Sequence, residues 1–458
     1  MNDLAPYPAY TTPAVLGLGD IPSHWEERRA KFYLREVDER SPSGTEEQLS
    51  VSHLTGVRPR RHKNVTMVAA SYVGHKVCQP GDVVVNTMWA WMAALGVSPR
   101  AGLVSPSYGV YRPRSPHTFV PAYLDRLLRL PAYADEYRVN STGVTSSRLR
   151  LYPDRFLNIS LIHPPFDEQR VIVGYLRRIE QQVGSAVRAK QELISLMREQ
   201  RRTVVGDAVR RGIGSSADLV ESGIPWVGAI PRTWEISRVK AEFICEDRKR
   251  IPLSGEERGR QTDRRYDYYG ASGVIDQVND YIFEGERLLI AEDGANLVLR
   301  NLPLAIIASG KYWVNNHAHV LRPRSGNITY LSWLLESIDY RPWITGAAQP
   351  KLTQDRLMSI KIAVPPVVEQ DKIVQRIRAL LTPIDNAIER IRREIDLLRE
   401  YQTRMTADVI TGKLDVRAAA AALSDADLHD PDLTAVFDAD EDGLNADLNG
   451  DDLPEELM

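Results

Sequence analysis

Apolar residues in two segments of the chain recur with the spacing of a long amphipathic helix. In the later segment one apolar series repeats every seven residues, and a second series, which skips position 402, lies four positions out of phase with it. The series are Ile377, Ile384, Ile391, Leu398 and Met405, and Val374, Leu381, Ile388, Ile395 and Val409. Charged residues fill the other faces, so the pattern predicts one apolar stripe on a solvated helix. Thr382-Pro383 resembles an N-cap with a first-turn proline, which predicts a short helix over 368–381 and a long one over 383–411.

The earlier segment carries a matching stripe, which Glu180 and Lys190 interrupt. Its apolar residues are Leu176, Val183, Val187, Ile194, Met197 and Val204. Two narrow stripes of equal length in one chain predict that the helices bury each other as an antiparallel coiled coil. The alternative that each helix packs only on its own globular domain remains open.

The two helical segments are copies of one element. A shift of 201 residues places Pro164–Arg211 on Pro365–Gly412 without a gap, with 13 of 48 positions identical. Each copy begins Pro-Pro-x-x-Glu-Gln, with Glu168-Gln169 in the first and Glu369-Gln370 in the second. A second phrase, Ile-Pro-x-x-Trp, lies upstream at 21–25 and 230–234. Each half is therefore predicted to be a globular region followed by a helix. This arrangement is typical of proteins that bind two sites at a fixed separation.

The segments between the helices have mixed patterns. Short β-branched runs predict strands at Val77–Asn86, Tyr108–Arg112, Leu288–Glu292 and Ala318–Leu321, with turns at 80–82 and 284–286. Helical patches lie at 120–130 and 330–338. The predicted fold class is α+β, with two domains of mixed structure that are each followed by a long helix. The expected parts are a first domain at 14–163, a helical spacer at 164–212, a second domain at 223–364, a second helical spacer at 365–416 and an acidic disordered tail at 417–458.

Composition narrows the class of protein. A chain of 458 residues that is 43% hydrophobic and 26% charged suits a soluble protein with two cores. Only Cys78 and Cys245 occur, which fits a reduced cytoplasm and excludes a disulfide framework or a zinc finger. We find no export signal and no run of 18 apolar residues, so we expect a cytoplasmic location.

The charge is distributed unevenly. Residues 424–458 hold 13 acidic and no basic residues, so residues 1–423 hold 58 basic and 48 acidic residues, a net charge of +10. A body with this charge is suited to binding a polyanion such as DNA. The tail has too little apolar content to fold and is expected to aid solubility, with DNA mimicry or partner docking as the alternative.

Several phrases together resemble the specificity subunit of type I restriction-modification systems. They are the strings at 223–240 (GIPWVGAIPRTWEISRVK), 81–113, 315–323 (NNHAHVLRP), 347–353 (AAQPKLT) and 409–416 (VITGKLDV), with both Pro-Pro-x-x-Glu-Gln helices. The resemblance covers about residues 14–416. It implies two target-recognition domains that each read one half of a bipartite DNA sequence, and paired helices that act as spacer and docking surface. It also implies two partner methyltransferase subunits, which use S-adenosylmethionine to methylate adenine, and two ATP-dependent restriction subunits.

The chain itself lacks the motifs of catalysis. An adenine methyltransferase needs an Asn/Asp-Pro-Pro-aromatic loop, whereas the nearest string here is His163-Pro164-Pro165-Phe166. Neither a Gly-rich cofactor fingerprint nor an ATP-binding loop occurs. The pair His317-x-His319 suggests a metal site, but with no Cys or carboxylate partner evident we expect an ordinary packed or hydrogen-bonded role. A nuclease site built from Asp263, Asp267, Glu292 and Asp293 is disfavoured because no Lys follows at the required spacing. We therefore expect a non-catalytic subunit that binds no cofactor and no metal.

Recognition of DNA then falls to loops rich in Lys, Arg, Asn, Gln and Thr. In the first domain the candidates are Arg58, Arg60, Arg61, Lys63, Asn64, Asn86, Trp89 and Arg148. In the second domain they are Arg248, Lys249, Arg264, Arg265, Lys311, Gln349, Lys351 and Thr353. Trp89 and Trp91 alternate on a strand-like run, so one of them is expected in the core. The alternatives to a DNA-specificity subunit are a helical scaffold that binds proteins and a self-sufficient restriction or modification enzyme.

Overall fold

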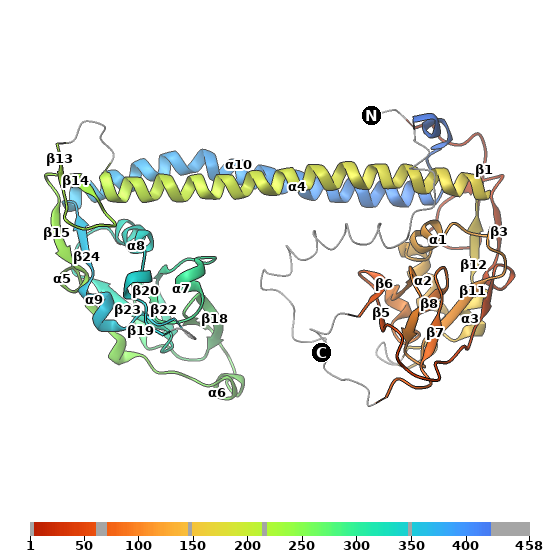
Figure 1. Cartoon of the computed structure of the whole chain (residues 1–458), viewed down its shortest axis with the longest axis horizontal. Helices are drawn as coiled ribbons and strands as arrows, with labels where there is room; N and C mark the ends of the chain where they lie inside the picture. Colours follow the sequence, from red (N-terminus) through yellow and green to blue (C-terminus); the bar gives the residue numbers. More distant parts are fainter. Residues whose placement is uncertain (1–3, 61–70, 145–148, 213–217, 347–349, 423–458) are drawn as a thin grey trace. The chain divides into compact units, whose positions relative to one another are not determined.

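The computed structural model describes residues 4–60, 71–144, 149–212, 218–346 and 350–422. The chain divides into two compact units, one of Met1–Lys190 with Glu394–Met458 and one of Gln191–Arg393. The boundary falls inside each of the two long helices, α4 (Phe166–Arg211) and α10 (Val367–Ile410) (Figure 1). Each unit therefore contains one mixed domain together with one part of each helix.

The first unit is built on a four-stranded antiparallel sheet in the order β4-β11-β8-β9. Its strands are β1 (Tyr10–Thr11), β2 (Ile21–Pro22), β3 (Glu26–Arg29), β4 (Leu34–Glu36), β5 (Leu49–Ser52), β6 (Gly56–Pro59), β7 (Lys76–Cys78), β8 (Val83–Val85), β9 (Leu95–Val97), β10 (Gly102–Val104), β11 (Gly109–Pro113) and β12 (Ser160–His163). Its helices besides α4 and α10 are η1 (Ala30–Phe32), η3 (Ala90–Met92), α1 (Pro121–Leu128), α2 (Pro131–Asn140), α3 (Pro153–Asn158) and η7 (Arg417–Ala422). β12 pairs with β3, so the end of the domain returns to its beginning.

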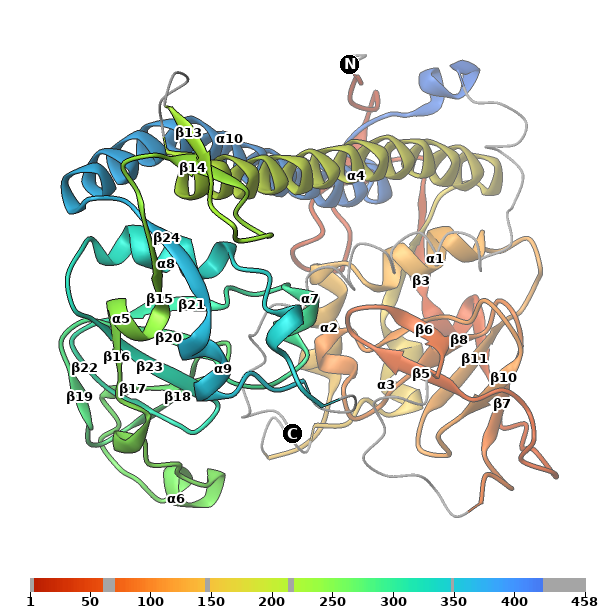
Figure 2. The same cartoon turned by 60° about the vertical axis from the view of Figure 1, so that its left-hand side comes forward.

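The second unit repeats this design with the sheet order β16-β23-β20-β21 (Figure 2). Its strands are β13 (Leu219–Glu221), β14 (Ala229–Pro231), β15 (Glu235–Arg238), β16 (Phe243–Cys245), β17 (Tyr266–Gly270), β18 (Gly273–Val278), β19 (Phe283–Glu284), β20 (Arg287–Ala291), β21 (Ala305–Ala308), β22 (Lys311–Val314), β23 (Ala318–Pro323) and β24 (Lys361–Val364). Its helices are α5 (Val239–Glu242), η5 (Asp247–Lys249), α6 (Gly255–Gly259), α7 (Asn296–Leu299), α8 (Ile328–Ser337), η6 (Arg341–Trp343) and α9 (Gln354–Ser359). Here β24 pairs with β15, as β12 pairs with β3 in the first unit.

The repeated phrases meet in each unit. The indole Nε1 of Trp25 donates to Glu168 Oε1 at 3.0 Å, and that of Trp234 donates to Glu369 Oε1 at 2.9 Å. In each unit, therefore, the same indole-to-glutamate hydrogen bond joins the Ile-Pro-x-x-Trp phrase to the Pro-Pro-x-x-Glu-Gln phrase. Both tryptophans are only 5% exposed, so the bond forms in an environment where leaving either partner unpaired is costly.

The glutamine of each phrase binds the start of a neighbouring helix. Gln169 Oε1 accepts from the backbone N–H of Val120 at 2.8 Å, directly before α1. Gln370 Oε1 accepts from the backbone N–H of Asn327 at 2.9 Å, directly before α8. The amide nitrogens of the two glutamines donate to the carbonyls of Pro164 and Pro365. The sequence repeat is thus a repeated structural joint between the long helix and its domain.

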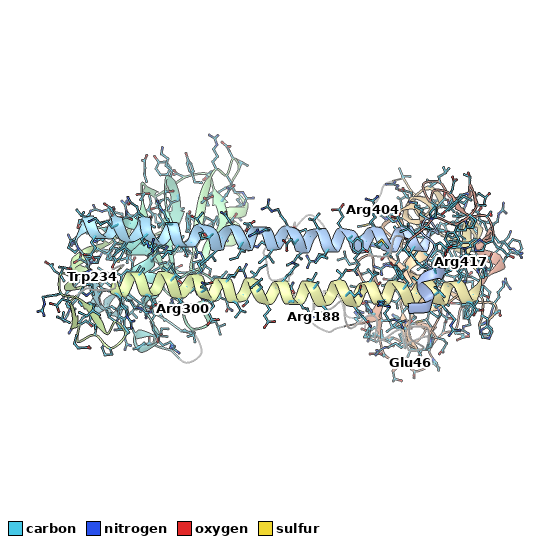
Figure 3. All side chains as sticks on the ribbon, turned by 90° about the horizontal axis from the view of Figure 1, so that it is seen from above. Glu46, Arg188, Trp234, Arg300, Arg404 and Arg417 are labelled. Atoms are coloured by element: carbon cyan, nitrogen blue, oxygen red, sulfur yellow. The ribbon has the colours of Figure 1, made fainter. Side chains whose placement is uncertain are left out.

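The two long helices pair side by side, as predicted (Figure 3). In the first unit the Tyr123 hydroxyl donates to the carbonyl of Ile410, at the end of α10. In the second unit the Tyr330 hydroxyl donates to the carbonyl of Val209, near the end of α4. The start of each helix therefore lies in the unit that also holds the end of the other helix, which is an antiparallel arrangement. Ile388, Ile391 and Ile395 of the predicted stripe are buried.

The two interruptions of the earlier stripe have structural causes. Lys190 Nζ lies 2.5 Å from Glu394 Oε2, so this residue makes an ion pair between the helices within the first unit. Glu180 accepts three hydrogen bonds from the Arg126 guanidinium of α1, at 2.8, 2.9 and 3.3 Å. Glu180 thus attaches α4 to the first domain.

The predicted break at Thr382-Pro383 is wrong, because α10 is one helix with Pro383 inside it. Thr382 does not cap a new helix; its hydroxyl donates to the carbonyl of Arg378, one turn earlier. Proline has no N–H to donate to residue 379, which weakens this turn. Leu381 and Ile388 are buried on either side of Pro383, and this packing holds the helix together across the missing bond.

Other local predictions agree with the structure. The patches at 120–130 and 330–338 form α1 and α8, and strands form in all four predicted runs. The run Val77–Asn86 is divided into β7 and β8 by the turn at Gly81, which has a φ of +87°. Of the predicted tail, residues 417–422 form η7, and residues 423–458 lie outside the described residues.

Replacing Pro383 by Ala should raise the free energy of unfolding by up to about 3 kcal/mol, because it restores a backbone hydrogen bond and removes a steric clash. The control is Asn386→Ala, at an exposed position one turn further on, for which helix propensity alone gives about 0.5 kcal/mol. Urea denaturation midpoints measure both changes. A loss of stability in Pro383→Ala would mean that the proline is needed for the helix path.

Candidate nucleic-acid interface

The predicted DNA-binding residues of the first unit are only partly described. Arg58 is half-buried on β6, paired across the hairpin with Ser50. Arg60 follows it and its guanidinium donates to Gln48 Oε1 at 3.4 Å. Arg61, Lys63, Asn64 and Arg148 lie outside the described residues.

Asn86 and Trp89 lie in the segment after β8. Asn86 is 7% exposed and its amide donates to the Tyr108 hydroxyl at 3.0 Å, so it contributes to the interior. Trp89 is 40% exposed, whereas Trp91 is half-buried with its indole donating to the carbonyl of Met88. The strand predicted for these tryptophans is wrong, since they flank and enter the 3-10 helix η3. Of the two residues, Trp89 is the one placed to meet a ligand.

Several predicted cations of the second unit are engaged with other side chains. Arg264 pairs with Asp276 at 3.0 Å, and Arg265 pairs with Asp263. Lys311 Nζ lies 4.5 Å from the centre of the Tyr281 ring. These cations can meet phosphate only by sharing or exchanging their present partners.

The remaining candidates gather around one place in the second unit. Arg248 and Lys249 lie on η5 and both are exposed, and Lys249 Nζ pairs with Glu246 Oε1 at 2.9 Å. Lys351 and Thr353 lie in the segment just before α9, and Gln349 is outside the described residues. Backbone bonds hold the second segment in place, since the Leu352 N–H donates to the Glu292 carbonyl at 2.7 Å and the Gly294 N–H donates to the Pro350 carbonyl at 3.1 Å.

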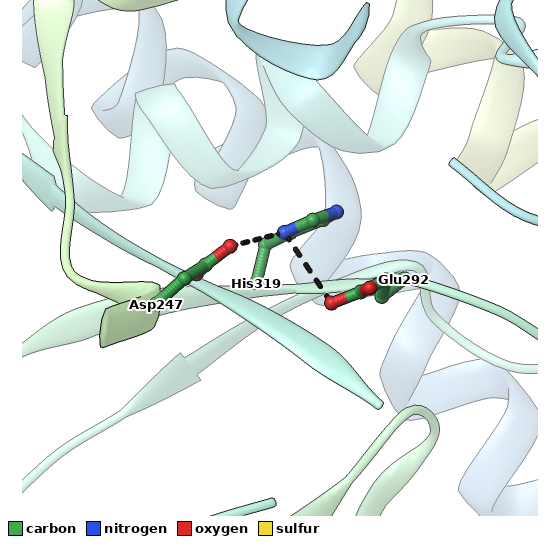
Figure 4. A group of neighbouring side chains, drawn as sticks. All are labelled: Asp247, Glu292 and His319. Carbon is green, nitrogen blue, oxygen red and sulfur yellow. Dashed lines mark hydrogen bonds and ion pairs between the residues drawn. The ribbon is translucent and has the colours of Figure 1, made fainter. Parts of the chain in front are cut away.

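A buried ionic cluster lies beneath these two segments (Figure 4). It contains Asp247 from η5, Glu292 just after β20 and His319 from β23, all of them buried. Arg250 Nη1 donates to Glu292 Oε2 at 2.6 Å, and its Nη2 lies 3.4 Å from Asp247 Oδ2. Lys351 Nζ lies 3.2 Å from Glu292 Oε1. The cluster is thus linked, through the ion pair of Glu292, to the predicted DNA contact Lys351.

Hydrogen bonding keeps both carboxylates of the cluster ionised. Burial by itself would raise the pKa of Asp247, but the hydrogen bond from His319 and that from the Val320 N–H outweigh it and the pKa is lowered. Burial likewise opposes ionisation of Glu292, and the hydrogen bond from Arg250 lowers its pKa. These are buried anions stabilised by specific donors.

Asp247, Glu292 and His319 have the spacing of a metal site, because one ligand atom of each lies within 4.8 Å of the others. His319 Nδ1 faces Asp247 Oδ2 at 2.6 Å and its Nε2 faces the Leu352 carbonyl at 2.7 Å. Both ring nitrogens are already engaged by these hydrogen-bond partners, and the Arg250 guanidinium lies against both carboxylates. The three residues therefore do not fit a metal ion.

The hydrogen-bonded role expected for His317 and His319 is confirmed, and both rings have carboxylate partners that were not evident from the sequence. His317 Nδ1 lies 2.9 Å from Asp293 Oδ2, and His319 binds Asp247. The two rings also differ in environment, with side-chain exposures of 48% and 1%. Sequence separations of 24 and 72 residues hid these partners, which only the sheet brings together.

The strings weighed for catalysis have structural roles. His163 at the end of β12 hydrogen-bonds the Thr118 carbonyl at 2.6 Å and stacks on the Tyr33 ring. Glu292 is paired with Arg250 and Lys351, and Asp263 is paired with Arg265. Among the described residues no helix is long and apolar enough to cross a membrane.

Comparisons with known proteins agree on one family. The family model described as the type I restriction modification DNA specificity domain matches residues 231–397. A Haemophilus influenzae protein named as a putative type I restriction enzyme specificity subunit is 39% identical over 115 residues, which cover 25% of this chain and 29% of that protein. The putative MjaX specificity subunit of Methanocaldococcus jannaschii is 23% identical over 313 residues, which cover 65% of this chain and 69% of that protein.

The fold has a solved counterpart. A structure from work on complex assembly and conformational transition of the type I R-M system has a TM-score of 0.56 at 16% identity, and the match covers 86% of this chain and 99% of that chain. At this identity the likeness concerns the fold. It supports the α+β class with paired helices.

Replacing Glu292 by Gln should destabilise the second unit by about 3–5 kcal/mol, because it leaves the buried Arg250 guanidinium without its closest anion. The control is Glu286→Gln at an exposed position, expected to change stability by less than about 0.5 kcal/mol. Denaturant unfolding, followed by a signal from the second unit, measures the stability of both variants. Equal stability of the two variants would show that the cluster contributes nothing to folding.

The same cluster should make the free energy of unfolding depend on pH in the acidic range. The folded-state pKa values of Asp247 and Glu292 lie below the ordinary values of 3.8 and 4.5. Their contribution is complete above these ordinary values and is lost as the pH falls through the lowered ones. The wild-type protein should therefore lose stability below about pH 4.5 more steeply than Glu292→Gln.

Proposed function

We propose that this chain, which belongs to the type I restriction-modification specificity subunits, recognises a bipartite DNA sequence in the cytoplasm, with each unit reading one half-site. The observation that carries this proposal is the duplication of the same sheet order and the same Trp-Glu joint in two units. One scaffold built twice with different loops suits the reading of two unlike short sequences.

The second unit offers the better-described reading surface. Lys351, Arg248 and Lys249 are exposed above the cluster, where cations can meet phosphates. Thr353 and Gln349 are residue types that bind base edges. In the first unit we assign the corresponding role to the cations Arg58, Arg60, Arg61 and Lys63 and, separately, to the exposed indole of Trp89.

The paired helices α4 and α10 are proposed to set the unspecified gap of the target and to dock partner subunits. Leu193 and Leu196 of α4 and Leu397 of α10 are exposed, at 43%, 56% and 63%, and supply apolar contact area on otherwise charged helices. The partners are two methyltransferase subunits that hold S-adenosylmethionine, with two ATP-dependent restriction subunits in the complete system. The chain itself contributes recognition and no catalysis.

The purified chain alone should neither methylate nor cleave DNA. Together with its cognate methyltransferase it should methylate adenines in two short half-sites that flank a fixed unspecified gap. Methylome sequencing of cells that express both proteins, compared with cells that express the methyltransferase alone, measures this. Methyl transfer by the isolated chain, or one contiguous motif, would contradict the proposal.

Replacing Lys351 by Ala should weaken binding to all DNA sequences and lower the slope of log K against log salt by about one, as expected for the loss of one phosphate contact. The control is Lys372→Ala, an exposed lysine on α10 outside the proposed reading surface. Salt titrations on cognate and scrambled duplexes measure both variants. A change confined to the cognate duplex would instead assign Lys351 to base reading.

A further inference from the structure

We infer that His319 is a positioning residue of the second unit, whose ring carries both nitrogen protons and thereby ties together the two segments that bear Arg248, Lys249, Lys351 and Thr353. His319 is 1% exposed and does not itself reach a ligand. The part of this inference that concerns DNA rests on the proposed function, whereas the part that concerns the ring does not.

The hydrogen-bond partners fix the protons of the ring. Nε2 faces the Leu352 carbonyl oxygen at 2.7 Å, and a carbonyl can only accept, so Nε2 carries a proton. Nδ1 faces Asp247 Oδ2 at 2.6 Å. The other oxygen of Asp247 accepts from the Val320 N–H at 2.8 Å, and Arg250 lies 3.4 Å from the carboxylate, so Asp247 is an anion. Nδ1 must then donate as well, and the ring is an imidazolium.

The charges around the ring are balanced by this assignment. Two anions face the ring, Asp247 of η5 and Glu292, whose Oε2 is 3.7 Å from Nδ1. The cations that face these anions from within the domain are the imidazolium and the half-buried Arg250, whose side chain is 13% exposed. Lys351 approaches Glu292 from the surface with a side chain that is 51% exposed. With a neutral ring, the two buried carboxylates would share a single buried guanidinium, which is a costly arrangement.

The ring joins two segments that are distant in sequence. Through Asp247 it holds η5, which carries Arg248 and Lys249. Through the Leu352 carbonyl it holds the segment between Lys351 and Thr353. Loss of either ring proton places a lone pair opposite an acceptor, so one of the two attachments must open. The charge of His319 therefore controls whether the ring can make both of these attachments at once.

The variant Asp247→Asn tests the assignment of the protons directly. An Asn amide can donate to Nδ1 of a neutral ring while its oxygen still accepts from the Val320 N–H. The neutral ring, with its proton on Nε2, is then fully satisfied. Nitrogen NMR of the ¹⁵N-histidine-labelled full chain at about pH 7.5 should show two protonated ring nitrogens for His319 in the wild type, and one in Asp247→Asn. The signal that disappears in His319→Gln identifies the residue among the nine histidines.

The variant His319→Gln tests the positioning role. Both N–H donors of a glutamine amide are on one nitrogen, which can take the place of only one of the two ring nitrogens, so the amide oxygen faces either Asp247 or the Leu352 carbonyl. Hydrogen exchange of the Leu352 amide should become at least about tenfold faster, and affinity for DNA should fall at least about tenfold on duplexes that carry the second half-site.

The double variant and a distant histidine serve as controls. Adding Asp247→Asn to His319→Gln should recover most of both losses, because the new amide at position 247 can donate to the new amide oxygen at position 319. His53→Gln, at an exposed histidine of the first unit, should change neither measurement. Failure of the double variant to recover Leu352 protection would contradict the matching of donors and acceptors on which the inference depends.

The outcomes separate the two proposals. A neutral His319 ring in the wild type, or unchanged Leu352 exchange in His319→Gln, would overturn the inference. Protonated nitrogens and faster exchange, with DNA affinity unchanged by His319→Gln, would overturn the coupling to recognition. If the wild type bound no DNA with or without its methyltransferase, the proposed function would fail, while the ring and exchange measurements would still decide the role of His319.

Discussion

The hydrogen bond between a buried indole and a helix-start glutamate is the interaction on which each unit depends. Trp25 with Glu168, and Trp234 with Glu369, join the beginning of a domain to the beginning of its long helix. The end of the other helix packs against the same joint. A Cβ on Gly412 would lie 2.4 Å from Pro22 Cδ, and one on Gly212 would lie 3.5 Å from Trp234 Cζ2. Both glycines have positive φ, so no other residue ends the helices there without strain.

The two joints are not equivalent in strength. Glu168 also accepts from the Tyr7 hydroxyl at 2.6 Å and lies 2.9 Å from His24 Nε2. Burial and the bond to Glu168 raise the pKa of the Tyr7 phenol, which therefore remains a donor. Residues upstream of the predicted domain boundary thus complete the first unit. In the second unit Glu369 accepts from the indole of Trp234 at 2.9 Å.

The polar interior of the second unit connects folding with recognition. Asp247, Arg250, Glu292 and His319 are costly to bury and would be easier to replace with apolar residues if stability were the only requirement. Their arrangement instead fixes the direction of two short segments that carry exposed cations. A buried network of directional bonds positions surface loops more narrowly than apolar packing does. On the function proposed above, the cluster supports a binding surface.

The sequence alone determined the elements whose information is local or repeated. The heptad stripe, the repeated phrases and the short β-branched runs predicted two α+β domains with paired helices, because periodicity and turns depend on neighbouring residues. Only the tertiary structure shows three further features. They are the continuation of the helix across Pro383, the pairing of Glu180 with an arginine, and the carboxylates that bind His317 and His319. Each depends on residues far apart in the chain, from Arg126 facing Glu180 to Asp247 meeting His319 across the sheet. Sequence spacing carries no record of such contacts, since the folded sheet creates the distances that determine hydrogen bonds and charge.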